Sequence, residues 1–88
     1  MAHYSVTFKP SVEKDFRALP KAVAHRVWAA IEKLAEEPLP RGALKLTGSE
    51  SLYRLRIGDY RLIYGVDNEK SQVLIHHIRH RREVYRQF

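Results

Sequence analysis

The chain has 88 residues, a formal net charge of +6 and no cysteine. This length predicts one domain over residues 1–88, and the lack of cysteine excludes disulfides and thiolate chemistry. No apolar run reaches the roughly 18 residues needed to cross a bilayer, and no charged segment followed by an apolar one opens the chain, so we expect a cytoplasmic protein with no membrane contact and no signal peptide.

The first half of the chain predicts one strand and two helices. Residues 3–8, HYSVTF, alternate apolar and polar side chains in the manner of a strand. Ser11, as a helix cap followed by acidic residues, predicts a helix over residues 11–18. Pro20 at a first helical position, followed by one apolar stripe, predicts an amphipathic helix of about 17 residues that ends before Pro38. The stripe consists of Val23, Ala24, Val27, Trp28, Ile31, Leu34 and Ala35.

The second half predicts a loop and three strands. Residues 38–51 are rich in turn formers, and residues 52–57 and 60–66 are strands joined by Gly58-Asp59, which suits a two-residue turn with glycine first. Residues 71–78 form a third strand whose apolar groups on both faces indicate a central position. A turn or short helix is expected over residues 83–86. The order β-α-α-β-β-β predicts an α+β domain, with an antiparallel sheet and both helices packed on one of its faces.

The two-residue turn also predicts which side chains share a face of the hairpin. It places Arg56 opposite Arg61, and it turns Arg54, Arg56 and Arg61 to the face away from the helices. The other face receives Tyr53, Leu55, Ile57, Tyr60, Leu62 and Tyr64. Like charges opposed in a sheet cost a few tenths to about 1 kcal/mol. The arginine face is therefore either a solvated surface or an anion site, since guanidinium donors match phosphate oxygens.

The third strand and the tail add further basic groups. His76, His77, Arg79 and His80 are followed by Arg81 and Arg82. The turn before the strand decides which of His76 and His77 joins the arginine face, and we expect one of them to do so. Tyr85 either anchors the tail or contacts RNA by stacking or donation. No acidic or cysteine partner lies at ligand spacing, so we expect neither a metal nor another cofactor.

The positive charge is concentrated toward the end of the chain. Residues 54–88 hold eight basic and four acidic groups, whereas residues 1–53 hold eight basic and six acidic ones. A basic patch of this kind attracts polyanions. The charge distribution therefore favours contact with nucleic acid or the ribosome.

Two segments carry a family resemblance. The run LTGSESLYRLRIGDYRLIYGVDNEK, followed by IRHRREVYR, resembles the RelE/ParE superfamily of bacterial toxin–antitoxin toxins, and the ending HRREVYR is similar to its RelE branch. The resemblance covers essentially the whole chain. It implies an RNase-like α+β fold and a ribosome-dependent endoribonuclease that cuts mRNA in the decoding site. It also implies a cognate antitoxin that wraps the toxin, so that operator DNA is bound only through the antitoxin complex.

The resemblance assigns roles to residues of this chain. Two family lysines fall on Arg54 and Arg56, two family arginines on Arg61 and Arg79, and the family tyrosine on Tyr85. Arginine stays protonated at any working pH. If a lysine acts as the base in relatives, either His77 or His76 accepts the proton here, or catalysis depends mostly on stabilisation of the phosphate. The expected catalytic set is Arg61, Arg79, Tyr85 and His77, and the expected RNA-binding set is Arg54, Arg56, Arg81 and Arg82.

Two other functions fit the same residues. A ParE-like protein would inhibit DNA gyrase without cutting any bond, with the basic tail gripping a protein or DNA surface. A degenerate relative would bind only antitoxin and DNA. A supercoiling assay with purified gyrase tests the first alternative, and absence of growth arrest on expression without antitoxin would indicate the second.

Overall fold

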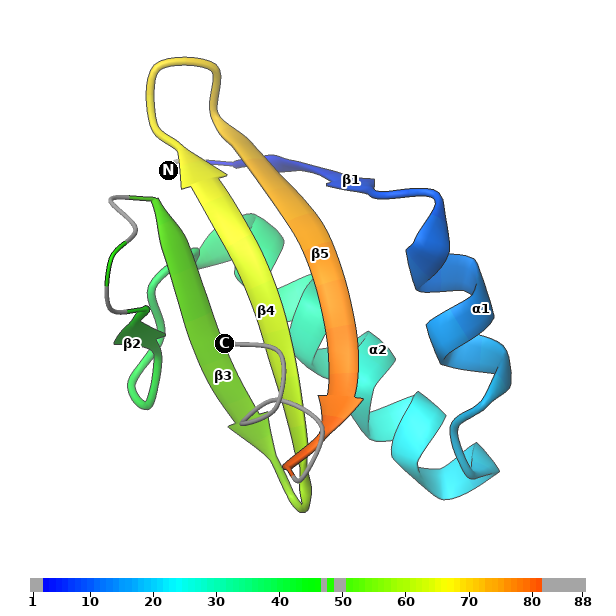
Figure 1. Cartoon of the computed structure of the whole chain (residues 1–88). Coiled ribbons are helices and arrows are strands. Elements are labelled where there is room, and N and C mark those ends of the chain that lie inside the picture. Colours follow the sequence, from blue (N-terminus) through cyan, green and yellow to red (C-terminus); the bar gives the residue numbers. More distant parts are fainter. Residues whose placement is uncertain (1–2, 47, 49–50, 82–88) are drawn as a thin grey trace.

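A computed structural model describes residues 3–46, 48 and 51–81 of the chain (Figure 1). In chain order the elements are β1 (Ser5–Phe8), α1 (Ser11–Arg17), α2 (Lys21–Glu36), β2 (Leu44–Lys45), β3 (Leu52–Ile57), β4 (Tyr60–Asp67) and β5 (Gln72–His80). The strands form one five-stranded sheet in the order β1-β5-β4-β3-β2. The predicted α+β class, the two helices and the β3–β4–β5 meander are confirmed.

One edge of the sheet departs from the antiparallel expectation. β1 pairs with β5 in parallel, from Ser5 opposite Gln72 to Phe8 opposite Ile75, so the sheet is mixed and β5 is an interior strand. No hairpin sets the direction of this pair, because both helices lie between β1 and the meander, and long crossovers permit parallel pairing. β2 lies in the predicted loop over residues 38–51 and has only two exposed residues, too few to show alternation.

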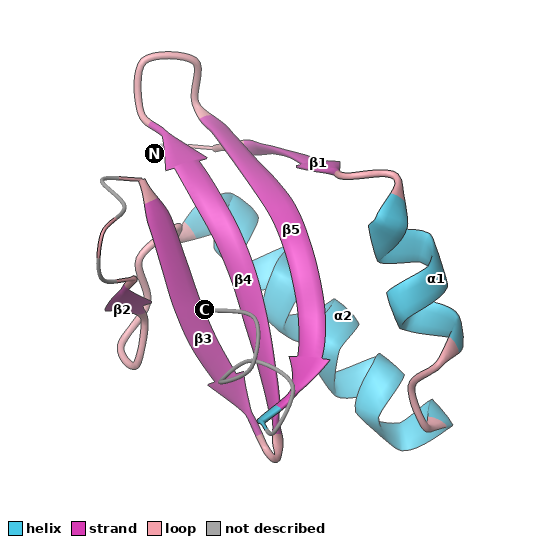
Figure 2. Ribbon diagram, viewed as in Figure 1, coloured by secondary structure: helices cyan, strands magenta, loops and turns pink. Residues whose placement is uncertain are grey.

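The core lies between α2 and the sheet. α2 crosses behind the strands, and α1 lies beside β5 (Figure 2). Val27, Ile31 and Leu34 of the predicted stripe are buried against sheet residues such as Leu62 and Ile75. Trp28 belongs to the predicted stripe but is not buried with it, since it is 48% exposed. The prediction of Ser11 as the cap of α1 was wrong: Pro10 occupies that position, with no side-chain capping bond.

The turn at Gly58-Asp59 forms as predicted. Gly58 has φ +61°, in the region that suits the first position of a two-residue hairpin turn. The resulting register pairs Ile57 with Tyr60, Arg56 with Arg61 and Tyr53 with Tyr64. On the helix side of the turn, the Arg26 guanidinium lies 3.3 Å from where a Cβ of residue 58 would be. The hairpin arginines therefore share the face of the sheet that is turned away from α2.

Tyr64 links the sheet to the end of α2. Its ring is fully buried, and its hydroxyl donates a hydrogen bond of 2.8 Å to the Pro38 carbonyl. Burial, with a smaller contribution from Tyr53, raises the pKa of Tyr64 to about 12. Because this pKa lies above that of an unfolded tyrosine, near 10, the protonated hydroxyl stabilises the fold below about pH 10 and loses this effect as the pH rises toward about 12.

We predict that Tyr64→Phe lowers the free energy of unfolding by about 1 kcal/mol at neutral pH, because the Pro38 carbonyl loses its donor. The variant should also show a shallower loss of stability between about pH 10 and about pH 12 than the parent. Urea unfolding followed at several pH values measures both effects. Tyr4→Phe, which removes an exposed hydroxyl bonded to Asn68, is the control. Equal alkaline losses in parent and Tyr64→Phe would contradict the prediction.

Candidate nucleic-acid interface

We call the face of the sheet that is turned away from α2 the open face. A row of three arginines crosses this face. Arg56 on β3 lies opposite Arg61 on β4, and Arg61 lies opposite Arg79 on β5. Neighbouring strands are about 4.8 Å apart, so this arginine row spans about 10 Å. In Figure 1 the face of β3, β4 and β5 turned toward the viewer carries neither helix. Arg54 lies on the same face, two pairs further along the hairpin, opposite Ile63.

Backbone carbonyls hold the guanidinium groups of the arginine row. Arg56 Nε donates to the Gly58 carbonyl at 3.1 Å, and Arg61 Nη1 donates to the Tyr60 carbonyl at 3.1 Å. Arg79 Nη1 donates to the Ile78 carbonyl at 3.2 Å. These partial negative charges offset part of the repulsion between the cations without neutralising their formal charge. The row can therefore form on the fold and still attract a polyanion.

A β-bulge brings both His76 and His77 to the open face. Ile63 pairs with His77 and Tyr64 pairs with Ile75, which leaves His76 as the extra residue of β5. The two imidazole ring centroids are 6.2 Å apart. The expectation that only one histidine joins this face was wrong, because regular alternation fails at a bulge. In the sequence, the only trace of the bulge is the spacing of Ile75 and Ile78, which are both buried although three residues apart.

The environment of the two histidines favours their neutral forms. Burial lowers the pKa of His77 below its ordinary value, the Arg79 and Lys9 charges lower it further, and Asp15 opposes the change. Burial, Lys9 and His77 likewise lower the pKa of His76. His77 Nδ1 lies 3.4 Å from Arg79 Nη2. A neutral imidazole can accept a proton, so the open face combines an anion site with a potential base.

Asp15 is a member of this site that the sequence did not reveal. Its Oδ2 atom lies 2.6 Å from Arg79 Nη1 and accepts the Ile78 backbone N–H at 3.1 Å. In the sequence Asp15 is one of the acidic residues that follow Ser11, and its partners are more than sixty residues away, with no local pattern to connect them.

The remaining predicted site residues lie at the end of β5 or beyond it. The Arg81 backbone N–H donates to the Asp59 carbonyl at 2.8 Å, which ties the end of β5 to the hairpin turn, and the Arg81 side chain is exposed. Arg82 and Tyr85 fall outside the described residues, as does the turn or helix expected over residues 83–86. Within residues 3–46, 48 and 51–81, no three His, Cys, Asp or Glu side chains gather as a metal site, and no helix could span a membrane.

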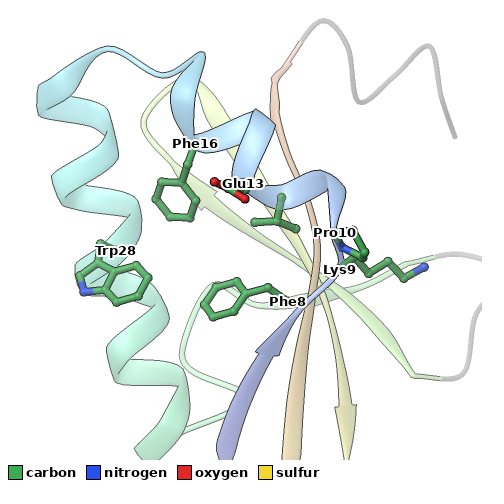
Figure 3. Close-up of a pocket in the computed structure, with 7 residues that line it drawn as sticks. Phe8, Lys9, Pro10, Glu13, Phe16 and Trp28 are labelled. Carbon is green, nitrogen blue, oxygen red and sulfur yellow. The ribbon is translucent and has the colours of Figure 1, made fainter.

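A second surface feature, the aromatic groove, lies between α1 and α2 (Figure 3). Phe8 stacks on Trp28 with ring centroids 6.1 Å apart, and Phe16 meets Trp28 edge-on at 6.0 Å. The groove has a volume of about 370 Å³. Its lining consists of Phe8, Lys9, Pro10, Val12, Glu13, Phe16 and Trp28. Phe8 and Trp28 remain 40% and 48% exposed, so this groove offers apolar surface to a partner.

The sequence and the fold match known toxins. Residues 6–85 match the family model described as the ParE toxin of type II toxin–antitoxin systems. Toxin RelG of Mycobacterium tuberculosis is 33% identical over 84 residues, covering 94% of this chain and 97% of that protein.

Solved structures of toxin–antitoxin complexes also match this chain. A chain of the archaeal RelE–RelB complex from Pyrococcus horikoshii OT3 superposes with a TM-score of 0.78 at 36% identity, covering 92% of this chain and 97% of that one. A chain of the RelBE2 toxin–antitoxin complex from M. tuberculosis gives 0.77 at 31% identity, covering 89% and 98%. The chain therefore belongs to the RelE/ParE superfamily as a RelE-like toxin of a type II toxin–antitoxin system.

Proposed function

We propose that this toxin is an endoribonuclease that cleaves mRNA on the ribosome and so inhibits translation. The observation that supports the proposal best is the arginine row, because three guanidinium groups on one open sheet face can bind an RNA backbone and stabilise charge on a reacting phosphate. The 2′-hydroxyl attacks its own 3′-phosphate, a 2′,3′-cyclic phosphate forms, and the 5′-oxygen leaves and takes up a proton.

Each group of the site has a role in this reaction. Arg61 and Arg79, at the centre and one end of the arginine row, stabilise the extra negative charge at phosphorus. His77 accepts the proton of the 2′-hydroxyl, as its neutral state permits. Tyr85 stacks on a base or donates to the phosphate. The backbone on either side is held by Arg54, Arg56, Arg81 and Arg82. Because guanidinium groups supply the positive charge, the reaction requires no metal ion.

We also infer that the toxin binds a cognate antitoxin, as the named RelE–RelB complexes do. The aromatic groove between α1 and α2 suits the apolar face of an amphipathic antitoxin helix. Contact with operator DNA then occurs through the toxin–antitoxin complex. The groove lies between α1 and α2, whereas the arginine row lies on the face of the sheet away from α2. The two surfaces adjoin at Lys9, which lines the groove and whose charge acts on His77.

Mapping of RNA 5′ ends after brief induction tests the proposed activity. We expect new ends inside translated frames, at fixed positions within codons, and the same ends when purified toxin is added to a translation extract that contains a reporter mRNA. The family model that matches is described for ParE toxins, which keeps gyrase inhibition as the alternative. Inhibition of supercoiling by purified gyrase, with intact mRNA on ribosomes, would replace the nuclease proposal with that alternative.

A further inference from the structure

We propose that Asp15 is a positioning residue of the RNA-cleaving site, which fixes Arg79 and, through Arg79, the base His77. This inference rests on the proposed nuclease function. It makes α1, which carries none of the residues expected from the sequence to act on RNA, a working part of the site.

Asp15 lies beside β5 where the pairing of β1 with β5 has ended. Pairing of β1 with β5 ends at Phe8 and Ile75, and the Lys9 backbone N–H makes the last bond, to the Ile75 carbonyl at 3.0 Å. Beyond this point the Asp15 carboxylate accepts the Ile78 backbone N–H, as a neighbouring strand would. Asp15 is therefore anchored to the backbone of β5 just after the bulge that places the histidines.

A chain of contacts begins at the Asp15 carboxylate and ends at His77. Asp15 Oδ2 lies 2.6 Å from Arg79 Nη1, and the other terminal nitrogen of Arg79 lies 3.4 Å from His77 Nδ1. The guanidinium plane thus connects the carboxylate to the imidazole. An arginine side chain has many rotamers, and restricting them costs conformational entropy. Because Asp15 already holds Arg79 in one rotamer, this entropy need not be lost when substrate binds.

The ion pair between Arg79 and Asp15 is largely buried. The side chains of Arg79 and Asp15 are only 16% and 13% exposed. The ion pair between Arg17 and Glu13 on the same helix has side chains 76% and 73% exposed, which is typical of a solvated pair with little energetic effect. The pair at the site is shielded from such screening, so it can hold Arg79 in one orientation.

The charges around His77 give the inference a distinctive signature. Lys9 and Asp15 face it from the segment of β1 and α1, and His76 and Arg79 face it from β5. Of these, Asp15 carries negative charge and favours the protonated imidazole. Neutralisation of Asp15 therefore lowers the pKa of His77 further. In the profile of cleavage rate against pH, the acidic limb, where His77 gains a proton, then moves to lower pH.

The test compares Asp15→Asn with Glu32→Gln, which removes one exposed negative charge from α2. The full-length proteins are added to ribosomes that carry a reporter mRNA, and cleavage rates are measured across the acidic pH range. We expect Asp15→Asn to cleave about 10- to 100-fold more slowly, with its acidic limb at lower pH, and Glu32→Gln to match the parent. In an Arg79→Lys background, Asp15→Asn should lower the cleavage rate by a smaller factor than it does in the parent, because Asp15 acts through Arg79.

A folded Asp15→Asn protein that has the parental rate and the parental acidic limb overturns the inference, and so does an equal effect in both backgrounds. If Asp15→Asn does not fold, Asp15→Glu decides the question: it keeps the charge and displaces the carboxylate, so we expect the parental limb and a rate about threefold or more below the parent. A parental rate for Asp15→Glu also overturns it. Lack of cleavage by the parent rejects the proposed function itself, before any variant is compared.

Discussion

Replacement of Arg61 by alanine is expected to lower the rate of mRNA cleavage on ribosomes about 100- to 1,000-fold, as loss of a main donor to a developing oxyanion does. Arg61 is the middle member of the arginine row, with Arg56 opposite it on one side and Arg79 on the other. A phosphate that is held by the row therefore contacts this guanidinium from any register. Among residues 3–46, 48 and 51–81, the Arg61 side chain hydrogen-bonds only to the Gly58 and Tyr60 carbonyls of its own turn, so its removal should leave the fold intact.

The matched control is Arg26→Ala. The Arg26 guanidinium lies beside the same turn, close to Gly58, but on the helix side of the sheet. Both variants lose one positive charge, and only Arg61→Ala loses it from the open face. Equal losses of cleavage would show that net charge, and not the arginine row, governs activity. Undiminished cleavage by Arg61→Ala would remove this residue from the site.

The parts of the fold that local chemistry determines could be predicted from the sequence. The hairpin is the clearest case: Gly58 supplies the positive φ of the turn, and the turn then sets every pair from Ile57 to Tyr53. The amphipathic helix α2 could be predicted equally well, because Val27, Ile31 and Leu34 recur on one side of it. The parallel pairing of β1 with β5 was not, since two helices separate these strands and no turn geometry connects them.

The candidate site divides in the same way. The arginines of the hairpin share a face because strand alternation requires it, and Arg79 joins them through the pairing of β4 with β5. The bulge at His76 and the carboxylate of Asp15 depend on how α1 meets the edge of β5, which no sequence period records. The roles of Arg82 and Tyr85 stay predictions, because these residues lie outside the described part of the chain.

Arg79→Met is expected to affect stability as well as cleavage, unlike Arg61→Ala. The substitution keeps much of the apolar stem but leaves the Asp15 carboxylate, 13% exposed, without its cation. Removal of one partner from a buried pair costs about 3–5 kcal/mol, and we expect about 2 kcal/mol for this partly exposed pair. Urea unfolding at neutral pH measures the loss, and Arg61→Ala should stay within about 0.5 kcal/mol of the parent.

The double variant Asp15→Asn with Arg79→Met separates the two effects. The asparagine oxygen can still accept the Ile78 N–H, and no unpaired charge is left, so most of the stability lost in Arg79→Met should return. Cleavage should stay about 100-fold or more below the parent, because the cation at this end of the arginine row is absent. A double variant as unstable as Arg79→Met would contradict the explanation by unpaired charge. Recovery of stability without recovery of cleavage would show that Arg79 acts on the substrate as well as on the fold.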